Sequence, residues 1–456
     1  EAVLYQNNIT QIEWDKNGKF CKILANKVQI ESISENSFVN YIEPEIDTRT
    51  PLLNKARSLV NVVPVNMDLP EGLGLKGENI KIGVWDYGLT GFHRDIEGQF
   101  QNVETSFFNN GGTQHTTMVT GAIVSKGVIR EENIGMAPKA KVYAYNFFGD
   151  ILNEIVSAKN SYGVYVSNHS YNLGAAFRCF SDYSYNTASI QIDQLALDEP
   201  EIVTVFAAGN SAVACAYDYK TIVSGFQYGK NTITVGNLQN NETFYPGSAK
   251  GPTNDGRLKP DVMAKGSSSF VPTLGIVLPT PTDNYTYGYG TSFASPLVTG
   301  IVGLMQQAYL EKYGTMPLSS TIKAVLCNTA KDLGNKGPDY EYGFGKADAY
   351  EAVKSIQSAS FIEDSIINNE EKIFPIQIAS GTTEAKFLIT WNEIPTSIPN
   401  TKVLVNDIDI EVLSPDGKTI LPLVLNPFIP AKLAQEGRDS INNIEQIVIN
   451  FPTSGE

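Results

Sequence analysis

The chain has 456 residues, of which 42% are hydrophobic and 18% are charged, and its formal net charge is −15. This length predicts two or three domains with ample material for a core. The acidic balance argues against a nucleic-acid partner, which would need a basic face, and indicates a dispersed, solvated surface. No apolar run reaches the roughly 20 residues of a membrane-spanning helix, so we expect no membrane span.

Residues 1–50 form a candidate N-terminal segment. Two short strand-like pieces, 11–14 and 20–24, are separated by Asn and Gly turns. Pro44 and Pro51 flank a polar linker, and we place the first domain boundary there.

From residue 51 to 357, apolar strand-like runs alternate with helix-like runs. Strands are predicted at 80–86, 141–147, 163–170, 201–207 and 231–235. Helices are predicted at 115–124, 152–160, 190–197, 296–309 and 319–328. This alternation is typical of an α/β fold, a doubly wound parallel sheet with helices on both faces and right-handed crossovers.

In residues 358–456 the pattern changes to strands of period two. Examples are 385–391, 403–412 and 447–451, and 414–417 (S-P-D-G) predicts a turn with Pro at its second position. We expect a C-terminal all-β sandwich or jelly-roll domain.

The heptapeptide G-T-S-F-A-S-P at 290–296 precedes an apolar run at 297–309. Apolar residues on nearly every face predict a helix buried in a large core. Pro296 suits the first turn of that helix, where its missing N–H costs nothing. Gly300 and Gly303 would let a neighbouring backbone approach closely.

Ser292 would then lie at a helix N-terminus, where free N–H groups and the helix dipole favour a developing anion. The alternative is that Ser292 or Thr291 only caps the helix, as most such residues do. An acyl-transfer nucleophile also needs a base, which is usually a histidine held by a carboxylate. The rest of the chain must supply both.

The chain has three histidines, His93, His115 and His169. His115 opens the predicted helix at 115–124. Asp86 ends the predicted strand at 80–86, and the carboxyl ends of parallel strands are where open α/β sheets place their sites. We expect His169 to be a hydrogen-bonded core histidine and His93 to be structural.

The order Asp86, His115, Ser292 resembles that of the subtilisin-like serine proteases, the subtilases. Their serine motif, G-T-S-x-A-x-P, matches fully. D-Y-G at 86–88 replaces the usual D-S-G or D-T-G, and H-T-T-M-V-T-G at 115–121 replaces H-G-T-x-V-A-G. A buried strand ends in A-A-G-N, whose Asn210 corresponds to the family's side-chain donor to the oxyanion.

The resemblance implies a serine endopeptidase that acts on protein or peptide substrates and needs no cofactor for its chemistry. Asp86 would orient His115, and His115 would take the proton of Ser292. Asn210 and the Ser292 N–H would bind the oxyanion. It also implies a specificity pocket built from Ser170, Tyr171, Asn172, Ala207, Ala208 and Gly209, with Thr291 beside the nucleophile.

The family further implies a propeptide ahead of the catalytic domain. Residues 1–50 are therefore either its remnant or an extension that stays packed on the enzyme. Residues 405–409 and 442–445 resemble the C-terminal β-domain of one subtilase branch. Subtilases often carry calcium, and Asp407 and Asp409, on one face of a predicted strand, are candidate Ca²⁺ ligands; the alternative is that both are solvated.

Cys179 and Cys215 flank the A-A-G-N strand, and a disulfide between them could rigidify the substrate cleft. Cys327 lies in a predicted amphipathic helix and is expected to be a buried small hydrophobe. The chain starts at Glu1 without a signal-peptide pattern, as processed or trimmed sequences do. We expect a location outside the cell or at its surface.

Three other functions remain open. Thr116, in place of glycine beside the base, is compatible with a catalytically attenuated subtilase-like binding protein. A serine-carboxyl protease would use a Glu base at acid pH instead of a histidine. Finally, the C-terminal β-domain could make the protein an adhesin with incidental proteolysis.

Overall fold

The structure is a computed structural model that describes residues 2–9, 12–14, 21–23, 25–37, 39, 42, 52–104, 110–172, 184–210, 218–223, 225–267, 276–397 and 402–455. Contacts divide the chain into two units, Glu1–Thr50 and Pro51–Glu456. The second unit contains both the predicted catalytic segment and the predicted C-terminal domain. The boundary that the sequence predicts at residue 358 therefore stays a prediction.

The first unit has two helices, α1 (Ala2–Gln6) and α2 (Lys27–Ser34), and one antiparallel pair of strands, β1 (Ile12–Trp14) and β2 (Cys21–Ile23). Both strands lie where the sequence predicts them. Asn26 caps α2 in a reciprocal capping box with Gln29. Leu4, Ile9 and Ile33 form the small core of this first unit.

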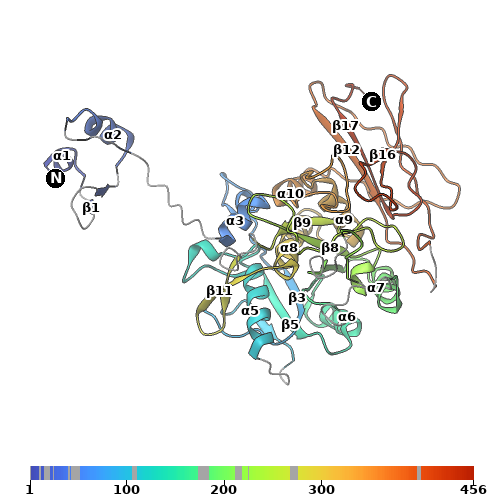
Figure 1. The fold of residues 1–456 in the computed structure, drawn as a ribbon, viewed down its shortest axis with the longest axis horizontal. Helices are drawn as coiled ribbons and strands as arrows, with labels where there is room; N and C mark the ends of the chain where they lie inside the picture. The colour runs from blue at the N-terminus through green and yellow to red at the C-terminus, as the bar shows by residue number, and fades with distance from the viewer. Residues whose placement is uncertain are drawn as a thin grey trace. The chain divides into compact units, whose positions relative to one another are not determined.

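A parallel sheet of seven strands forms the centre of the second unit (Figure 1). Its strands are β3 (Lys81–Asp86), β4 (Phe100–Asn102), β5 (Lys141–Asn146), β6 (Val166–His169), β7 (Val203–Ala207), β8 (Ile233–Leu238) and β9 (Val262–Lys265). They lie in the order β4-β5-β3-β6-β7-β8-β9, and every neighbouring pair is parallel. The predicted α/β class is confirmed, whereas β4 and β9 were not predicted.

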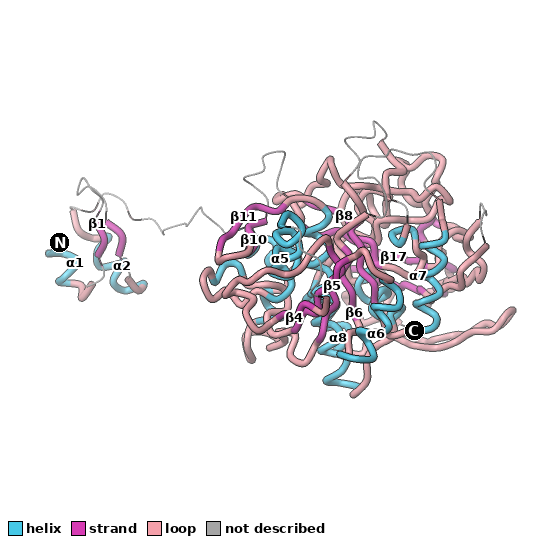
Figure 2. The backbone as a smooth tube through the Cα atoms, turned by 90° about the horizontal axis from the view of Figure 1, so that it is seen from below, coloured by secondary structure: helices cyan, strands magenta, loops and turns pink. Residues whose placement is uncertain are grey.

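Helices cover both faces of this sheet (Figure 2). They are α3 (Leu52–Leu59), α4 (Val63–Asn66), α5 (Asn110–Val124), α6 (Ile151–Tyr162), α7 (Thr187–Asp198), α8 (Thr291–Tyr313), α9 (Ser319–Asn328) and α10 (Ala349–Gln357). Alternate residues of each strand face opposite sides. Ile82 and Val84 pack in the core that includes α5 and α8, whereas Trp85 and Tyr145 pack in the core that includes α6 and α7.

The strand order reverses its direction beside β3. From β3 the chain adds β5 and β4 on one side, and β6 to β9 continue on the other side. Ligand sites of open α/β sheets lie in the crevice at the carboxyl ends of the strands at such a point. Asp86 ends β3 and Ser170 directly follows β6, so both residues lie at this crevice.

Helix α8 begins five residues earlier than the sequence predicts. Its first helical residue is Thr291, so Pro296 lies inside the helix rather than in its first turn. Thr291 and all residues from 293 to 309 are buried, as predicted for a core helix, and α8 contacts β6, β7, β8 and β9.

A hairpin that the sequence did not reveal precedes α8. Strands β10 (Ile276–Thr280) and β11 (Asn284–Gly288) pair antiparallel, and β10 contacts α5. Pro279 within β10 weakened the strand signal, because Pro is disfavoured in strands outside edges. The hairpin brings residues 286–289 to the N-terminus of α5.

The C-terminal segment is built from antiparallel pairs. Strand β12 (Glu384–Thr390) pairs with β17 (Ile444–Asn450), β13 (Val412–Leu413) with β14 (Thr419–Ile420), and β15 (Leu423–Val424) with β16 (Gln435–Glu436). The turn at 414–417 is confirmed by the bond from the Gly417 N–H to the Ser414 carbonyl. The described strands pair only two at a time, so the sandwich stays a prediction.

The predicted strand at 403–412 was wrong for all but its last residue. The N–H of Asn406 donates to Glu393 Oε1 and the N–H of Ile410 donates to Glu445 Oε2. Side-chain carboxylates thus satisfy backbone groups that a neighbouring strand would otherwise bind.

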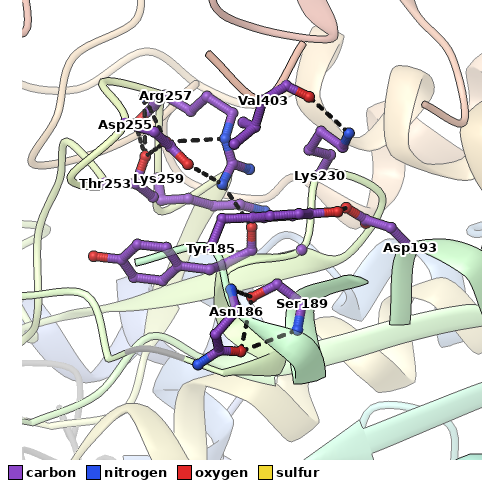
Figure 3. Close-up of polar contacts among 12 residues, drawn as sticks. Tyr185, Asn186, Ser189, Asp193, Lys230, Thr253, Asp255, Arg257, Lys259 and Val403 are labelled. Carbon is purple, nitrogen blue, oxygen red and sulfur yellow. Dashed lines mark hydrogen bonds and ion pairs between the residues drawn. The ribbon is translucent and has the colours of Figure 1, made fainter. Parts of the chain in front are cut away.

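A buried polar cluster joins this segment to Lys230, in the loop that precedes β8 (Figure 3). Lys230 Nζ donates to the carbonyl oxygen of Val403 at 2.9 Å and also to that of Ile394. Nearby, Tyr185 donates to Asp193 Oδ2 at 2.7 Å, and Arg257 pairs with Asp255 at 2.9 Å. Burial lowers the pKa of Lys230 to about 8, which neighbouring carboxylates only partly oppose.

Cys327 is free and fully buried in α9, as the sequence predicts. Cys179 and Cys215 lie outside the described residues. Among the helices of the described ranges, none combines the length and the apolar character needed to cross a membrane.

Gly300 and Gly303 differ in what a side chain would meet. A Cβ at Gly300 would lie 2.4 Å from Met136 Cβ, whereas at Gly303 it would lie 3.2 Å from the flexible end of Ile82. We expect Gly300→Ala to destabilise the protein by about 1–3 kcal/mol through overpacking. The matched Gly303→Ala should stay within about 1 kcal/mol of wild type, since better helix propensity offsets its milder contact. Melting curves of both variants test this, and equal losses would contradict it.

Candidate active site

Asp86 and His115 form a close pair at the crevice. His115 Nδ1 lies 2.8 Å from Asp86 Oδ1 and 3.0 Å from Oδ2. Asp86 is 1% exposed and also accepts the N–H of Tyr87 on Oδ1 at 2.6 Å. The carboxylate therefore fixes the ring through Nδ1 and leaves Nε2 directed away from it.

Burial opposes a positive charge on His115, but the charge of Asp86 and its hydrogen bond outweigh burial and raise the pKa of the imidazole above 6.5. The side chain remains 30% exposed, so solvent reaches the ring. A base of this kind is neutral, and able to accept a proton, only above that raised pKa.

The other two histidines belong to the core. His169 lies between Trp85 and Phe206, with ring centroids at 5.4 and 4.3 Å, and its nitrogens bond Tyr171 and Ser167. Burial lowers the pKa of His169 to about 3. The prediction of a hydrogen-bonded core histidine is confirmed. Burial also lowers the pKa of His93, whose Nδ1 accepts the N–H of Asp95.

The N-terminus of α8 is held by Asn210, a residue of the segment that follows β7. Gly290, at the cap position, has φ +115° and no side chain to accept a helix N–H. Asn210 Oδ1 replaces such a cap, accepting the Thr291 N–H at 2.9 Å and the Thr291 hydroxyl at 3.0 Å. Because its oxygen is thus engaged, the amide N–H groups of the exposed Asn210 point elsewhere.

Ser292 is the second residue of α8, and its backbone N–H lies in the first turn, where N–H groups lack the i−4 acceptor of a helix interior. Its hydroxyl donates to the carbonyl of Ser170 at 3.2 Å. The ring of the next residue, Phe293, lies 5.2 Å from that of His115. The described residues include no hydrogen bond between His115 and Ser292, so the two lie on neighbouring surfaces without being joined.

The two departures from the family motifs leave this pair accessible. Tyr87, which replaces a small residue, turns its ring outward against Phe147 and Phe148, at 5.6 Å from each. Thr116, which replaces glycine, is buried and directs its hydroxyl to the carbonyl oxygens of Gly88 and Gly112, at 3.1 and 3.0 Å. Neither side chain interposes itself between Asp86 and His115.

A cleft of about 220 Å³ opens beside His115. It is lined by Gln114, His115, Met118, Thr286, Tyr287, Gly288, Tyr289 and Phe293. Apart from His115, these residues were missed from the sequence, because four of them belong to β11 and its continuation. Alternating tyrosines at 285, 287 and 289 were the available signal for that strand.

The predicted pocket residues are mostly buried. Tyr171 is 8% exposed and its hydroxyl bonds His169, so its side chain faces the core rather than a pocket. Ala207 and Ala208 are buried, and the carbonyls of Ala208 and Gly209 already accept the N–H groups of Val223 and Ala249. Asn172 is half-buried beside the crevice.

Asp407 and Asp409 are engaged by cations of the chain. Lys402 lies 3.3 Å from Asp407, and Arg438 lies 3.4 Å from Asp409. Glu445 Oε1 is buried without a hydrogen-bond partner, and burial together with nearby carboxylates raises the pKa of Glu445 to about 8. Across the described ranges, no three His, Cys, Asp or Glu side chains gather as a metal site, so calcium binding at Asp407 and Asp409 stays a prediction.

The family model of the subtilases matches residues 77–345, a range that contains Asp86, His115, Asn210 and Ser292. The chain belongs to the subtilase family. As a member of this family, it is a subtilisin-like serine protease.

Several known proteins are similar to the chain. Subtilisin DY from Bacillus licheniformis is 29% identical over 291 residues, covering 62% of this chain and 93% of that protein. Fervidolysin from Fervidobacterium pennivorans is 26% identical over 301 residues, covering 59% of this chain and 40% of that protein. The structure of the prenylagaramide maturation protease PagA aligns with a TM-score of 0.48 at 19% identity, over 68% of this chain and 99% of that one.

The opposing effects of burial and Asp86 on His115 can be separated by NMR. In the wild type we expect the imidazole resonances of His115 to titrate above pH 6.5. In Asp86→Asn the burial remains and the attracting charge is gone, so the midpoint should fall below that of the wild type. His169 should stay neutral throughout as an internal control. A midpoint unmoved by Asp86→Asn would contradict this assignment.

Proposed function

We propose that the chain is a serine endopeptidase in which Ser292 attacks the peptide carbonyl, His115 is the general base and Asp86 orients it. The observation that supports this most directly is the bond between His115 Nδ1 and Asp86, because it leaves Nε2 available in a ring that packs against Phe293, the residue after Ser292. With Nδ1 engaged, the ring keeps the tautomer that leaves Nε2 free to accept a proton.

The first step requires a rotation of the nucleophile. The Ser292 hydroxyl turns from the Ser170 carbonyl to His115 Nε2, passes its proton to that nitrogen, and Oγ bonds the substrate carbonyl carbon. The imidazolium then returns the proton to the leaving amine. Water repeats the sequence and releases the acyl group from Ser292.

The developing oxyanion would be bound by two donors. One is the Ser292 N–H in the first turn of α8, and the other is the amide of Asn210, whose oxygen is held by Thr291. Donors aligned in advance lower the barrier because they need not reorganise during the reaction.

The substrate would lie extended along the backbone that follows β6. Rotation of the Ser292 hydroxyl frees the Ser170 carbonyl to accept an N–H from such a peptide. Asn172 and Gly209 would border the pocket for the side chain next to the cleaved bond, with Tyr171, Ala207 and Ala208 contributing backbone. Profiling the cleavage of a peptide library would determine which side chain this pocket prefers.

One observation favours a second candidate, a catalytically attenuated subtilase-like binding protein. In this structure the Ser292 hydroxyl donates to Ser170 and not to His115. A fluorophosphonate probe separates the two functions, because only an activated serine reacts with it. Labelling of the wild type, but not of Ser292→Ala, supports the endopeptidase.

We expect Ser292→Ala to abolish hydrolysis and Asn210→Ala to lower kcat by about 10²–10³-fold, the loss established for an oxyanion donor in a subtilisin. KM should change little for Asn210→Ala, since the oxyanion forms only during the reaction. Activity should fall as pH drops through the raised pKa of His115. An acid optimum would instead support a carboxylate base.

Hydrolysis is proposed to need no cofactor, with any calcium structural. Binding at Asp407 and Asp409 requires both to leave Lys402 and Arg438, so millimolar calcium should raise the melting temperature by no more than about 4 °C. The rise should be absent from the Asp407→Asn, Asp409→Asn double variant. A chelator should leave the initial rate unchanged, and a drop in rate would contradict a purely structural role.

Residues 1–50 are proposed to be part of a propeptide, and the protein is proposed to work outside the cell or at its surface. Adding the isolated 1–50 peptide to protein that lacks it tests the first point. Slower hydrolysis that reverses on dilution is the expected result.

A further inference from the structure

Pro296 leaves one backbone group of the nucleophilic residue without its helical partner. In an α-helix the N–H of residue i bonds the carbonyl of residue i−4, so the N–H of residue 296 would bond the carbonyl of Ser292. Pro296 has no N–H and lies inside α8. The carbonyl of Ser292 must therefore be satisfied from outside the helix.

Ser170 supplies the missing donor. Its hydroxyl, 4% exposed, donates to the Ser292 carbonyl at 2.8 Å, and its own carbonyl accepts the Ser292 hydroxyl at 3.2 Å. Ser170 thus hydrogen-bonds both the backbone carbonyl and the side-chain hydroxyl of Ser292.

Asn168 sets the direction of this contact. It is fully buried in β6, and its Oδ1 accepts the hydroxyl of Ser295 at 2.9 Å. Thr299 Oγ1 lies 3.0 Å from the same oxygen. With Oδ1 engaged, Nδ2 donates to Ser170 Oγ at 3.0 Å. A hydroxyl that accepts on one side directs its single proton to the other, which here is the Ser292 carbonyl.

We propose that Asn168 and Ser170 are positioning residues for the nucleophile. Their relay replaces the hydrogen bond that Pro296 removes and fixes the first turn of α8, and with it both the hydroxyl and the oxyanion-binding N–H of Ser292. The inference rests on the proposed endopeptidase function and adds to it two residues that do not touch the reacting atoms through their side chains.

Pro296 allows a test that distinguishes this positioning role from a general structural role. Ser170→Ala removes the outside donor and should lower kcat by about 10- to 100-fold with KM nearly unchanged, because a slightly displaced nucleophile reacts poorly with a substrate that still binds. Pro296→Ala restores an N–H at the i+4 position. The Ser170→Ala, Pro296→Ala double variant should therefore recover most of the lost kcat.

The matched control is Ser167→Ala. Ser167 is likewise a buried serine and lies within β6, but its hydroxyl bonds His169 rather than α8. Its loss should lower the melting temperature without the drop in kcat. Turnover of a fluorogenic peptide and the rate of fluorophosphonate labelling give two independent readings of the nucleophile.

Two results overturn the inference: a Ser170→Ala variant with kcat close to that of the wild type, or a double variant no better than Ser170→Ala. A wild type that neither cleaves nor labels defeats the proposed function instead. The relay is then read from melting temperatures, where the loss from Ser170→Ala must be smaller in the Pro296→Ala background. Strictly additive losses would refute it.

Discussion

The first turn of α8 depends on hydrogen-bonding groups from the segments that directly follow β6 and β7. Helix ends leave N–H groups without partners, and an internal proline leaves a carbonyl without one. Here Asn210 accepts the N–H of Thr291, and Ser170 donates to the carbonyl of Ser292. Because β6 and β7 are hydrogen-bonded neighbours in the sheet, the helix end is registered against two adjacent strand ends. The geometry of the site is thus a property of the sheet as much as of the helix.

The sequence predicted which side chains would lie together better than it predicted the hydrogen bonds between them. Asp86 and His115, 29 positions apart, were predicted to meet, and they do. Buried parallel strands have continuous apolar runs in their sequence, so most of the central sheet was predictable. Motif spacing carries no information on side-chain rotamers, and the bond of the Ser292 hydroxyl to Ser170 could not be anticipated. The relay through Asn168 was equally hidden, since it joins residues more than 120 positions apart.

The wrong predictions share a physical cause, which is that side chains replaced expected backbone partners. Residues 403–411 look like a strand, but Glu393 and Glu445 bind the N–H groups of Asn406 and Ile410. The start of α8 was misplaced because Pro296 is usually found in a first turn, and only the tertiary contact of Ser170 makes it tolerable further in. Such substitutions become visible only when the acceptors and donors are located in space.

The cluster around Lys230 bears on how far the chain can be shortened. Its ammonium is buried, and two of its acceptors, the carbonyls of Ile394 and Val403, come from the C-terminal segment. Trimming the protein to its subtilase-like portion would expose this cation's pocket and leave Asn231 without the backbone of Glu393 that it now binds. The family match ends at residue 345, but a protein cut there would lose these stabilising contacts. A minimal catalytic fragment would therefore also need Lys230 replaced.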